Sequence, residues 1–191
     1  SNIGKGSTFE FSILVESCQQ SAKVLPQIDI STLSILVVDD NITNREVLRA
    51  QLERWGAKVI EAEGGKQALE LCSIALNENS LFDIALLDMQ MPTMDGEALA
   101  KSIRSQSAYD SIKLVMMTSM AQRGDASYFA KIGFSAYFPK PTTTEDLFKA
   151  LSVVADNGEV MQQASPLVTT HYLSTIEASS EPQADAEPEL I

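Results

Sequence analysis

Three apolar segments of this sequence end in charged residues that could do chemistry together. Asp39 and Asp40 follow the run ILVV, Asp88 follows the run IALL, and Lys140 follows the run YFP. A buried parallel strand is typically a short, continuous hydrophobic segment in the sequence, and polar residues that follow it lie at the edge of the sheet where the strand ends. We therefore expect three carboxylates and one ammonium group to converge at one edge of a sheet.

Three carboxylates in a low-dielectric cleft repel one another by on the order of several kcal/mol, so they need a cation in addition to the lysine. Ligands that are all oxygen atoms favour Mg²⁺. A magnesium ion beside a carboxylate at a strand end suits the acceptance of a phosphoryl group, because metal and ammonium neutralise the charge on its oxygens. We interpret Asp88 as the nucleophile.

The chain around these residues alternates between strand-like and helix-like segments five times. This alternation is typical of an α/β fold with a doubly wound parallel sheet, in which helices cover both faces. The strands are expected at 34–39, 57–62, 82–87, 112–117 and 134–138.

Helix boundaries follow from turn and capping residues. Gly56 and Gly133 are placed to end two helices, and Asp95 to begin another. Thr142 and Glu145 have capping-box spacing at the start of the last helix. The helices should pack through apolar stripes: Leu48, Leu52 and Trp55; Ala68, Leu71, Cys72 and Ala75 in a helix over about 65–77; Leu99 and Ile103; Leu147, Phe148, Leu151 and Val154.

Composition and charge argue against nucleic-acid binding and against a membrane-spanning segment. The 191 residues carry a net charge of −12, and residues 155–191 contain seven acids and no Lys or Arg, which is typical of a solvated linker. No basic face for nucleic acid and no apolar run long enough for a membrane span is evident. Cys18 and Cys72 lack metal-ligand spacing and are interpreted as free thiols in a reducing compartment. We expect a cytoplasmic location without direct membrane contact, even if the parent protein is anchored in an inner membrane.

Five motifs in this order resemble the receiver domain of two-component signalling over residues 34–156. They are Asp39-Asp40, the run DMQMP from Asp88, the run MDG, Thr118-Ser119, and YFPKP around Lys140. The resemblance implies a flavodoxin-like (βα)5 fold with strand order 2-1-3-4-5. Residues 1–16 look like the end of a histidine-kinase ATP-binding domain, 17–33 like a linker, and 157–191 like an acidic linker toward a further domain, so the parent resembles a hybrid sensor histidine kinase.

The resemblance also implies a role for each matching residue. Asp88 would be phosphorylated, Asp40 would bind Mg²⁺ directly, and Asp39 would bind it mostly through water. Gln90 would offer its backbone carbonyl to the metal. Thr118 and Lys140 would each contact a phosphoryl oxygen, and Tyr137 would be the aromatic switch that turns inward beside Thr118. The bond between Lys140 and Pro141 would be cis.

The same resemblance implies which domains would donate the phosphoryl group to this chain and accept it from this chain. The phosphoryl donor would be a phosphohistidine on the kinase dimerisation domain, outside this chain. A histidine phosphotransfer domain would be the next acceptor, unless this receiver only regulates its own kinase. The chain itself would be a phosphoacceptor, while the parent would be the phosphotransferase.

Other classes fit less well. Phosphohydrolases that resemble haloacid dehalogenases need an acid two residues after the nucleophile, where this chain has Gln90. A flavodoxin-like nucleotide-binding protein should have a phosphate-binding loop of Ser, Thr and Gly after its first strand. This chain has Asp39 and Asp40 at that place, and their carboxylates would repel a phosphate. A receiver that is never phosphorylated and serves as an intramolecular interaction module remains an alternative. His171 lacks the amphipathic helix of a phosphotransfer domain, and residues 4–8 lack the spacing of a phosphate loop.

Overall fold

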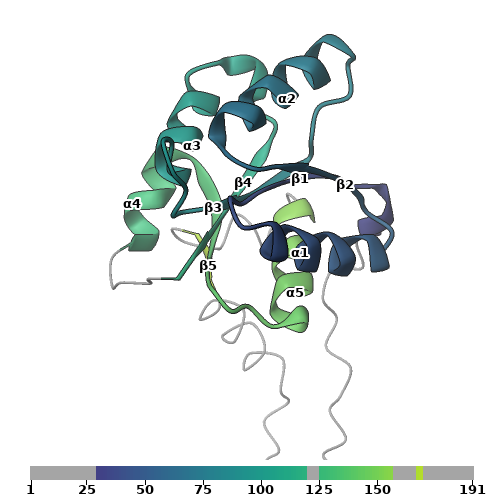
Figure 1. Ribbon diagram of the computed structural model, residues 1–191. Helices are drawn as coiled ribbons and strands as arrows, with labels where there is room; N and C mark the ends of the chain where they lie inside the picture. The colour runs from purple at the N-terminus through teal and green to yellow at the C-terminus, as the bar shows by residue number, and fades with distance from the viewer. Residues whose placement is uncertain (1–28, 120–124, 157–166, 170–191) are drawn as a thin grey trace, which may run out of the picture.

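The computed structural model describes residues 29–119, 125–156 and 167–169, and its strands form one parallel sheet in the order β2-β1-β3-β4-β5-β6 (Figure 1). The strands are β1 Ser34–Val38, β2 Lys58–Ala62, β3 Ile84–Asp88, β4 Lys113–Thr118, β5 Phe134–Pro139 and β6 Val168–Thr169. The helices are α1 Ile42–Arg54, α2 Gly65–Asn77, α3 Gly96–Arg104, α4 Asp125–Ile132 and α5 Thr144–Asp156, with short 3-10 turns at Ile30–Thr32 and Ser107–Tyr109. The predicted α/β fold and its strand order are confirmed.

Helices cover both faces of the sheet, and each face has its own hydrophobic core. Helices α1 and α5 pack on one face, and α2, α3 and α4 pack on the other (Figure 1). Successive residues of a strand point to opposite faces, so β1 supplies both cores. Ile35 and Val37 lie in the core under α1 and α5, while Leu36 and Val38 lie in the other. Burial on both faces explains why the inner strands β1, β3 and β4 are nearly continuous apolar runs, whereas the edge strand β2 carries Lys58 and Glu61.

Most helix ends lie where the sequence predicted them. Gly56 and Gly133 follow α1 and α4 with φ of 88° and 103°, values that glycine adopts without strain. Asp95 caps α3, because its carboxylate accepts a hydrogen bond from the backbone N–H of Ala98 at 2.7 Å. Helix α2 spans the predicted range.

The capping prediction for α5 was wrong by one residue. Thr143, not Thr142, caps the helix: its Oγ1 accepts a hydrogen bond from the backbone N–H of Asp146 at 3.0 Å. The sequence TTTED allows either register, and the structure selects the second because the Thr142 hydroxyl donates to the carbonyl of Pro139 at 2.7 Å. The shift leaves the apolar face of α5 intact.

Phe148 was predicted on the inner face of α5, yet its side chain is 36% exposed. Its ring packs edge-on against Trp55, with ring centroids 5.1 Å apart. Phe148 therefore covers the join between α1 and α5 instead of entering the core.

Both edges of the domain extend beyond the predicted range of 34–156. Ile30 is buried in the core under α1 and α5. Val168 and Thr169 form the parallel strand β6 along β5, although residues 157–191 were expected to be linker throughout. Segments of two or three residues are too short to show hydrophobic periodicity, so neither the burial of Ile30 nor the pairing of β6 with β5 could be predicted from the sequence pattern.

Several expectations fall on residues outside the described ranges: the kinase-like segment 1–16, the linker 17–28, Cys18, and His171. Within the described ranges Cys72 is a buried free thiol, as predicted. None of the helices described here combines the length and the apolar character that crossing a bilayer requires.

Candidate metal site at the carboxyl ends of the strands

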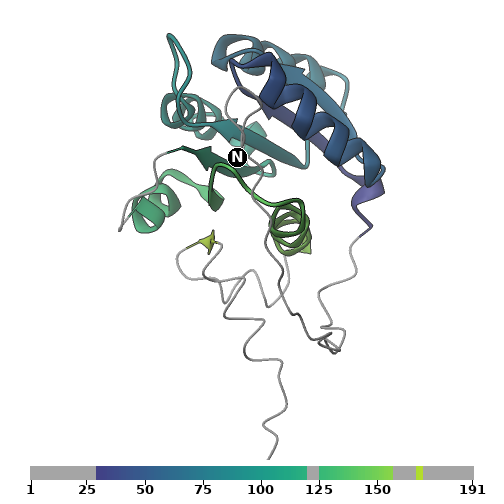
Figure 2. The same ribbon diagram turned by 60° about the horizontal axis from the view of Figure 1, so that its bottom comes forward.

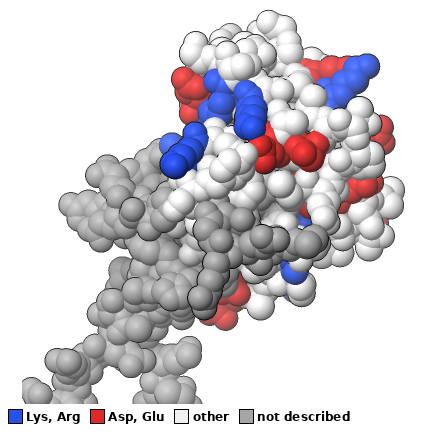
Figure 3. Space-filling view, turned by 90° about the vertical axis from the view of Figure 1, so that its left-hand side faces the viewer, with Lys and Arg blue, Asp and Glu red and all other residues white. Residues whose placement is uncertain are grey.

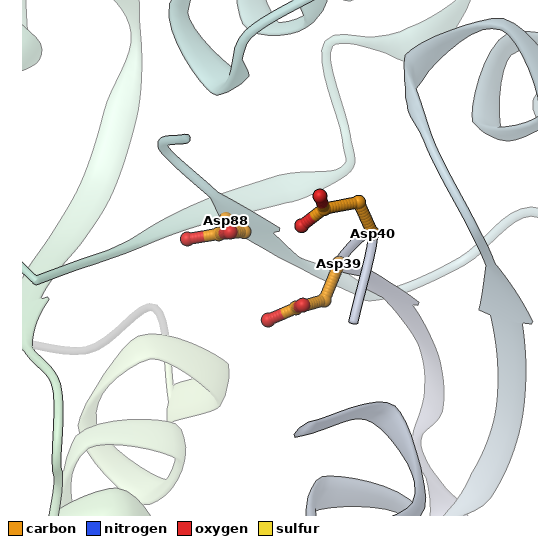
Figure 4. A group of neighbouring side chains, drawn as sticks. All are labelled: Asp39, Asp40 and Asp88. Atoms are coloured by element: carbon orange, nitrogen blue, oxygen red, sulfur yellow. The ribbon is translucent and has the colours of Figure 1, made fainter. Parts of the chain in front are cut away.

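Three carboxylates meet where β1 and β3 end (Figure 4). Asp39 and Asp40 directly follow β1, and Asp88 is the last residue of β3. One oxygen atom from each of the three lies within 4.8 Å of the others. Parallel pairing of β1 with β3 produces this convergence, because it brings the two strand ends to the same edge.

The Asp39 carboxylate is almost fully buried, with 1% of the residue exposed, and it is surrounded by donors. Its Oδ1 accepts a hydrogen bond from the backbone N–H of Asn41 at 2.8 Å. The side-chain amide of Asn44 lies 3.2 Å from both oxygens. These donors fix the orientation of the carboxylate before any ligand arrives.

Lys140 joins the two buried carboxylates. Its Nζ lies 2.6 Å from Asp39 Oδ2 and 2.9 Å from Asp88 Oδ1. The backbone N–H of Lys140 donates to the carbonyl of Thr118 at 2.6 Å, which ties the loop after β5 to the end of β4. The peptide bond between Lys140 and Pro141 is cis, as predicted.

Electrostatics at this site are set by burial as much as by the ion pairs. Burial raises the pKa of the Asp88 carboxyl above its usual value; the hydrogen bond and charge of Lys140 oppose this rise without cancelling it, and Asp39 adds to it. Burial acts to lower the pKa of Lys140, but its hydrogen bonds to Asp39 and Asp88 outweigh burial and raise it. The ammonium therefore stays charged, while Asp88 lacks full compensation.

Asp40 differs from its neighbours because it is exposed. It lines an open hollow together with Glu63, Gly64 and Gly65 before and at the start of α2, and with residues 92–94 before α3. Solvent and small ions can reach the carboxylate cluster from this side.

Gly96 lets the loop after β3 fold back onto the site. A Cβ atom at this position would lie 2.4 Å from the backbone oxygen of Asp88 and 3.1 Å from the Cα of Met89. The backbone N–H of Gly96 donates to the carbonyl of Met89 at 3.1 Å. The sequence indicated a turn at Asp95-Gly96, and the close approach supplies the reason that the second residue is glycine.

The other predicted residues lie around the same edge. Thr118 ends β4 and is buried. Gln90 is exposed, and its backbone N–H hydrogen-bonds the Asp88 carboxylate. Tyr137 of β5 pairs with Met116 of β4, two residues before Thr118. Tyr137 is only 6% exposed and stacks on Phe129 of α4 with ring centroids 5.3 Å apart.

The carboxylate cluster fits a divalent cation that prefers oxygen ligands. Three carboxylate oxygens lie close enough to share one ion, and one of them is open to solvent. Among the residues that the structure describes, no histidine or cysteine belongs to the cluster, and this all-oxygen ligand set favours Mg²⁺ over softer metals.

Sequence reasoning missed the residues that hold Asp39 in place. Asn41 caps α1 and Asn44 lies three residues later, so both belong to the first turn of the helix that follows the strand. Arg45 donates to the backbone oxygen of Asp39 at 2.7 Å. The recognisable signal was the pair of asparagines spaced as N-cap and N3, since such residues face the strand end that precedes them.

The face that carries α3 and α4 mixes basic and acidic side chains (Figure 3). On it, Glu97 accepts hydrogen bonds from Lys101 at 2.5 Å and from the Tyr128 hydroxyl at 2.6 Å. The hydrogen bond between Glu97 and Tyr128 connects α3 to α4. The ion pair between Glu97 and Lys101 places opposite charges side by side on α3.

Comparison with known proteins identifies the family. Residues 35–152 match the response regulator receiver domain, which is more than half of the chain. The chain belongs to the response regulator receiver domain family, as the motifs indicated.

Relatives include both chemotaxis proteins and sensor kinases. The chain is 34% identical over 123 residues to chemotaxis protein CheY1 of Helicobacter pylori, covering 64% of this chain and 96% of CheY1. It is 33% identical over 156 residues to the sensor histidine kinase AruS of Pseudomonas aeruginosa, covering 81% of this chain but 15% of AruS. The high-resolution structure of the chemotaxis response regulator CheY4 of Vibrio cholerae superposes with a TM-score of 0.58 at 30% identity, covering 64% of this chain and 98% of CheY4. The chain thus spans a small fraction of the sensor kinase that it matches.

Proposed function

We propose that this chain is a phosphoaccepting receiver of a phosphorelay, in which Asp88 takes a phosphoryl group from a phosphohistidine of a kinase dimerisation domain. The observation that carries the proposal is the position of Lys140, whose ammonium contacts Asp39 and Asp88 at the same time. A half-buried ammonium between two carboxylates is poised to contact a third anionic group when one is attached to Asp88.

In the transfer step, an Asp88 carboxylate oxygen forms a bond to phosphorus as the bond between phosphorus and the donor histidine nitrogen breaks. The carboxylate is already the attacking anion, so no general base has to remove a proton. Lys140 then pairs with one phosphoryl oxygen, and the Thr118 hydroxyl donates to another.

Asp39, Asp40, Asp88 and the backbone carbonyl of Gln90 would hold Mg²⁺. Bound there, the ion would neutralise the charge that develops on the phosphoryl oxygens. Asp39 is saturated with protein donors while Asp40 is exposed, which supports a direct contact from Asp40 and a water-mediated one from Asp39.

The readout of phosphorylation would be a change at α4, β5 and α5. Thr118 moves toward the phosphoryl group, and Tyr137 occupies the space beside it, so a local charge event alters the packing of this face. The buried, stacked position of Tyr137 on Phe129 is the position that this proposal assigns to the phosphorylated domain.

The parent protein is proposed to be a hybrid sensor histidine kinase, with a histidine phosphotransfer domain as the next acceptor. Because an ATP-dependent kinase would supply the phosphoryl group, we place this domain in the cytoplasm. Similarity to AruS across most of this chain supports that parentage.

Mass spectrometry separates this function from an unphosphorylated interaction module. Intact mass is measured after incubation with acetyl phosphate and Mg²⁺, and again after hydroxylamine. An active receiver gains the mass of one phosphoryl group and loses it in hydroxylamine, whereas an interaction module keeps its mass throughout.

A further inference from the structure

A sixth strand lies along the strand that carries the proposed switch residue. Strand β6 pairs in parallel with β5, with Val168 opposite Ala136 and Thr169 opposite Tyr137 (Figure 2, short yellow-green arrow). Without β6, the outer edge of β5 would present unpaired backbone donors and acceptors. The chain thus covers this edge with its own residues.

The docked segment is anchored by side chains on both faces of the sheet. Val168 is 0% exposed and belongs to the core under α1 and α5, while Leu167 is 3% exposed and belongs to the core that contains Tyr137 and Phe129. Alternation along an extended segment sends neighbouring residues to opposite faces, so two adjacent aliphatic residues fill both cores. Such burial distinguishes a fitted strand from a chain that passes over the surface.

We propose that the outer edge of β5 is a docking surface for an extended segment, that residues 167–169 of this chain are its occupant, and that their docking favours the phosphorylated form of the domain. The last part rests on the proposed function, because it uses the buried position of Tyr137 as the phosphorylated position.

The coupling follows from shared packing. Tyr137 stacks on Phe129, lies in the same core as Leu167, and is paired through its backbone with β6. Removing β6 removes apolar cover and strand pairing from Tyr137, which makes the buried position less favourable relative to an exposed one. By thermodynamic linkage, whatever docking contributes to the phosphorylated form, phosphorylation contributes equally to docking.

Hydrogen exchange of the full chain tests the first direction of this linkage. Exchange in peptides that contain residues 167–169 is compared with and without acetyl phosphate and Mg²⁺, and intact mass is recorded on the same samples. We expect slower exchange of these amides once Asp88 is phosphorylated. Unchanged or faster exchange in phosphorylated protein overturns the linkage and leaves the proposed function standing, whereas no phosphorylation overturns both.

Equilibrium binding of beryllium fluoride, a mimic of a phosphoryl group on a carboxylate, tests the reverse direction. Calorimetry on Val168→Asp should give an affinity at least about fivefold weaker than that of the unchanged chain, within the usual range of coupling between sites. Ile74→Asp is the matched control, because Ile74 is an exposed aliphatic residue on α2 and should leave the affinity unchanged.

Val168→Ala keeps the test valid if the aspartate variant fails to fold. It removes most of the buried side chain without adding charge, and it should weaken beryllium fluoride binding by a smaller factor than Val168→Asp. Equal affinities for the alanine variant and the unchanged chain, with β6 released as judged by fast exchange of residues 167–169, would overturn the proposal.

Discussion

The ammonium of Lys140 lies 2.6 Å from the carboxylate of Asp39, although the two residues are 101 positions apart in the sequence. The same ammonium reaches Asp88 at 2.9 Å, so one lysine from the loop after β5 compensates acids from the ends of β1 and β3. Both contacts are largely buried, where ion pairs act at lower dielectric than at the surface. The ion pairs of Lys140 with Asp39 and Asp88 therefore join the carboxyl ends of the strands through groups that the proposed reaction would also use.

Replacement of Lys140 by alanine should leave two buried carboxylates short of a partner. We expect Lys140→Ala to lower the free energy of unfolding by on the order of 2 kcal/mol without Mg²⁺, because a broken buried pair leaves uncompensated charge. Saturating Mg²⁺ should recover most of this loss, since the cation compensates the same acids. Thermal denaturation with and without Mg²⁺ measures both effects.

Lys101→Ala is the control for this variant, because Lys101 forms an exposed pair with Glu97 on α3. It should leave the stability of the domain nearly unchanged with or without the cation, as is usual for surface pairs. If Mg²⁺ stabilises Lys140→Ala no more than the unchanged chain, Lys140 and the cation do not share ligands. Phosphorylated Lys140→Ala should also show no change in hydrogen exchange around Tyr137.

Mg²⁺ itself should raise the melting temperature, and Asp40→Asn should remove most of that rise. Asp40 is the exposed member of the cluster, so its neutral amide loses cation affinity with little cost to the core. A ligand at about one hundred times its Kd stabilises the folded state by about 2.7 kcal/mol. Asp110→Asn, in the exposed loop before β4, should respond to Mg²⁺ like the unchanged chain.

Much of the fold could be predicted from the sequence because the inner parallel strands β1, β3 and β4 are nearly continuous apolar runs. Their ends differ from the predicted ends by at most two residues, and three acids at strand ends were enough to locate the site. The contacts of Asn44 with Asp39 and of Leu167 with the core were not predicted, because each depends on tertiary approach between segments with no local periodicity. The misplaced cap of α5 had another cause: three consecutive threonines offer two equivalent capping registers.

Gly96→Ala should damage the site even though alanine is the better helix former. Its Cβ would lie 2.4 Å from the backbone oxygen of Asp88, so the end of β3 or the start of α3 must shift. We expect a loss of about 1–3 kcal/mol in unfolding free energy, as for other overpacked sites, and weaker labelling by acetyl phosphate.

Gly64→Ala is the matched control for this change. A Cβ at Gly64 meets nothing within 4 Å, and the residue has an extended φ of 171° that alanine also adopts. Chemical denaturation should find it close to the unchanged chain. Equal stability of the two alanine variants would show that the approach of Gly96 to Asp88 is not tight in solution.

Cys72 should make stability depend on pH in alkaline solution. Burial raises the pKa of its thiol from the ordinary 9.0 to about 11. The unfolded chain therefore loses this proton first as pH rises, so the contribution of the neutral buried thiol is complete below pH 9.0 and is lost toward pH 11. The loss is on the order of 2 kcal/mol.

Comparison with Cys72→Ala isolates this effect from the titration of other groups. The difference in unfolding free energy between the two proteins should shrink as pH rises from 9 to 11. A difference that stays constant over this interval would mean that the thiol is not held neutral by burial.

The role of Asp88 as the phosphoryl acceptor is tested by the intact mass of Asp88→Asn after incubation with acetyl phosphate and Mg²⁺, beside the unchanged chain and Asp110→Asn. We expect one hydroxylamine-sensitive phosphoryl group on the unchanged chain and on Asp110→Asn, and none on Asp88→Asn. Labelling that persists in Asp88→Asn would mean that another residue accepts the phosphoryl group.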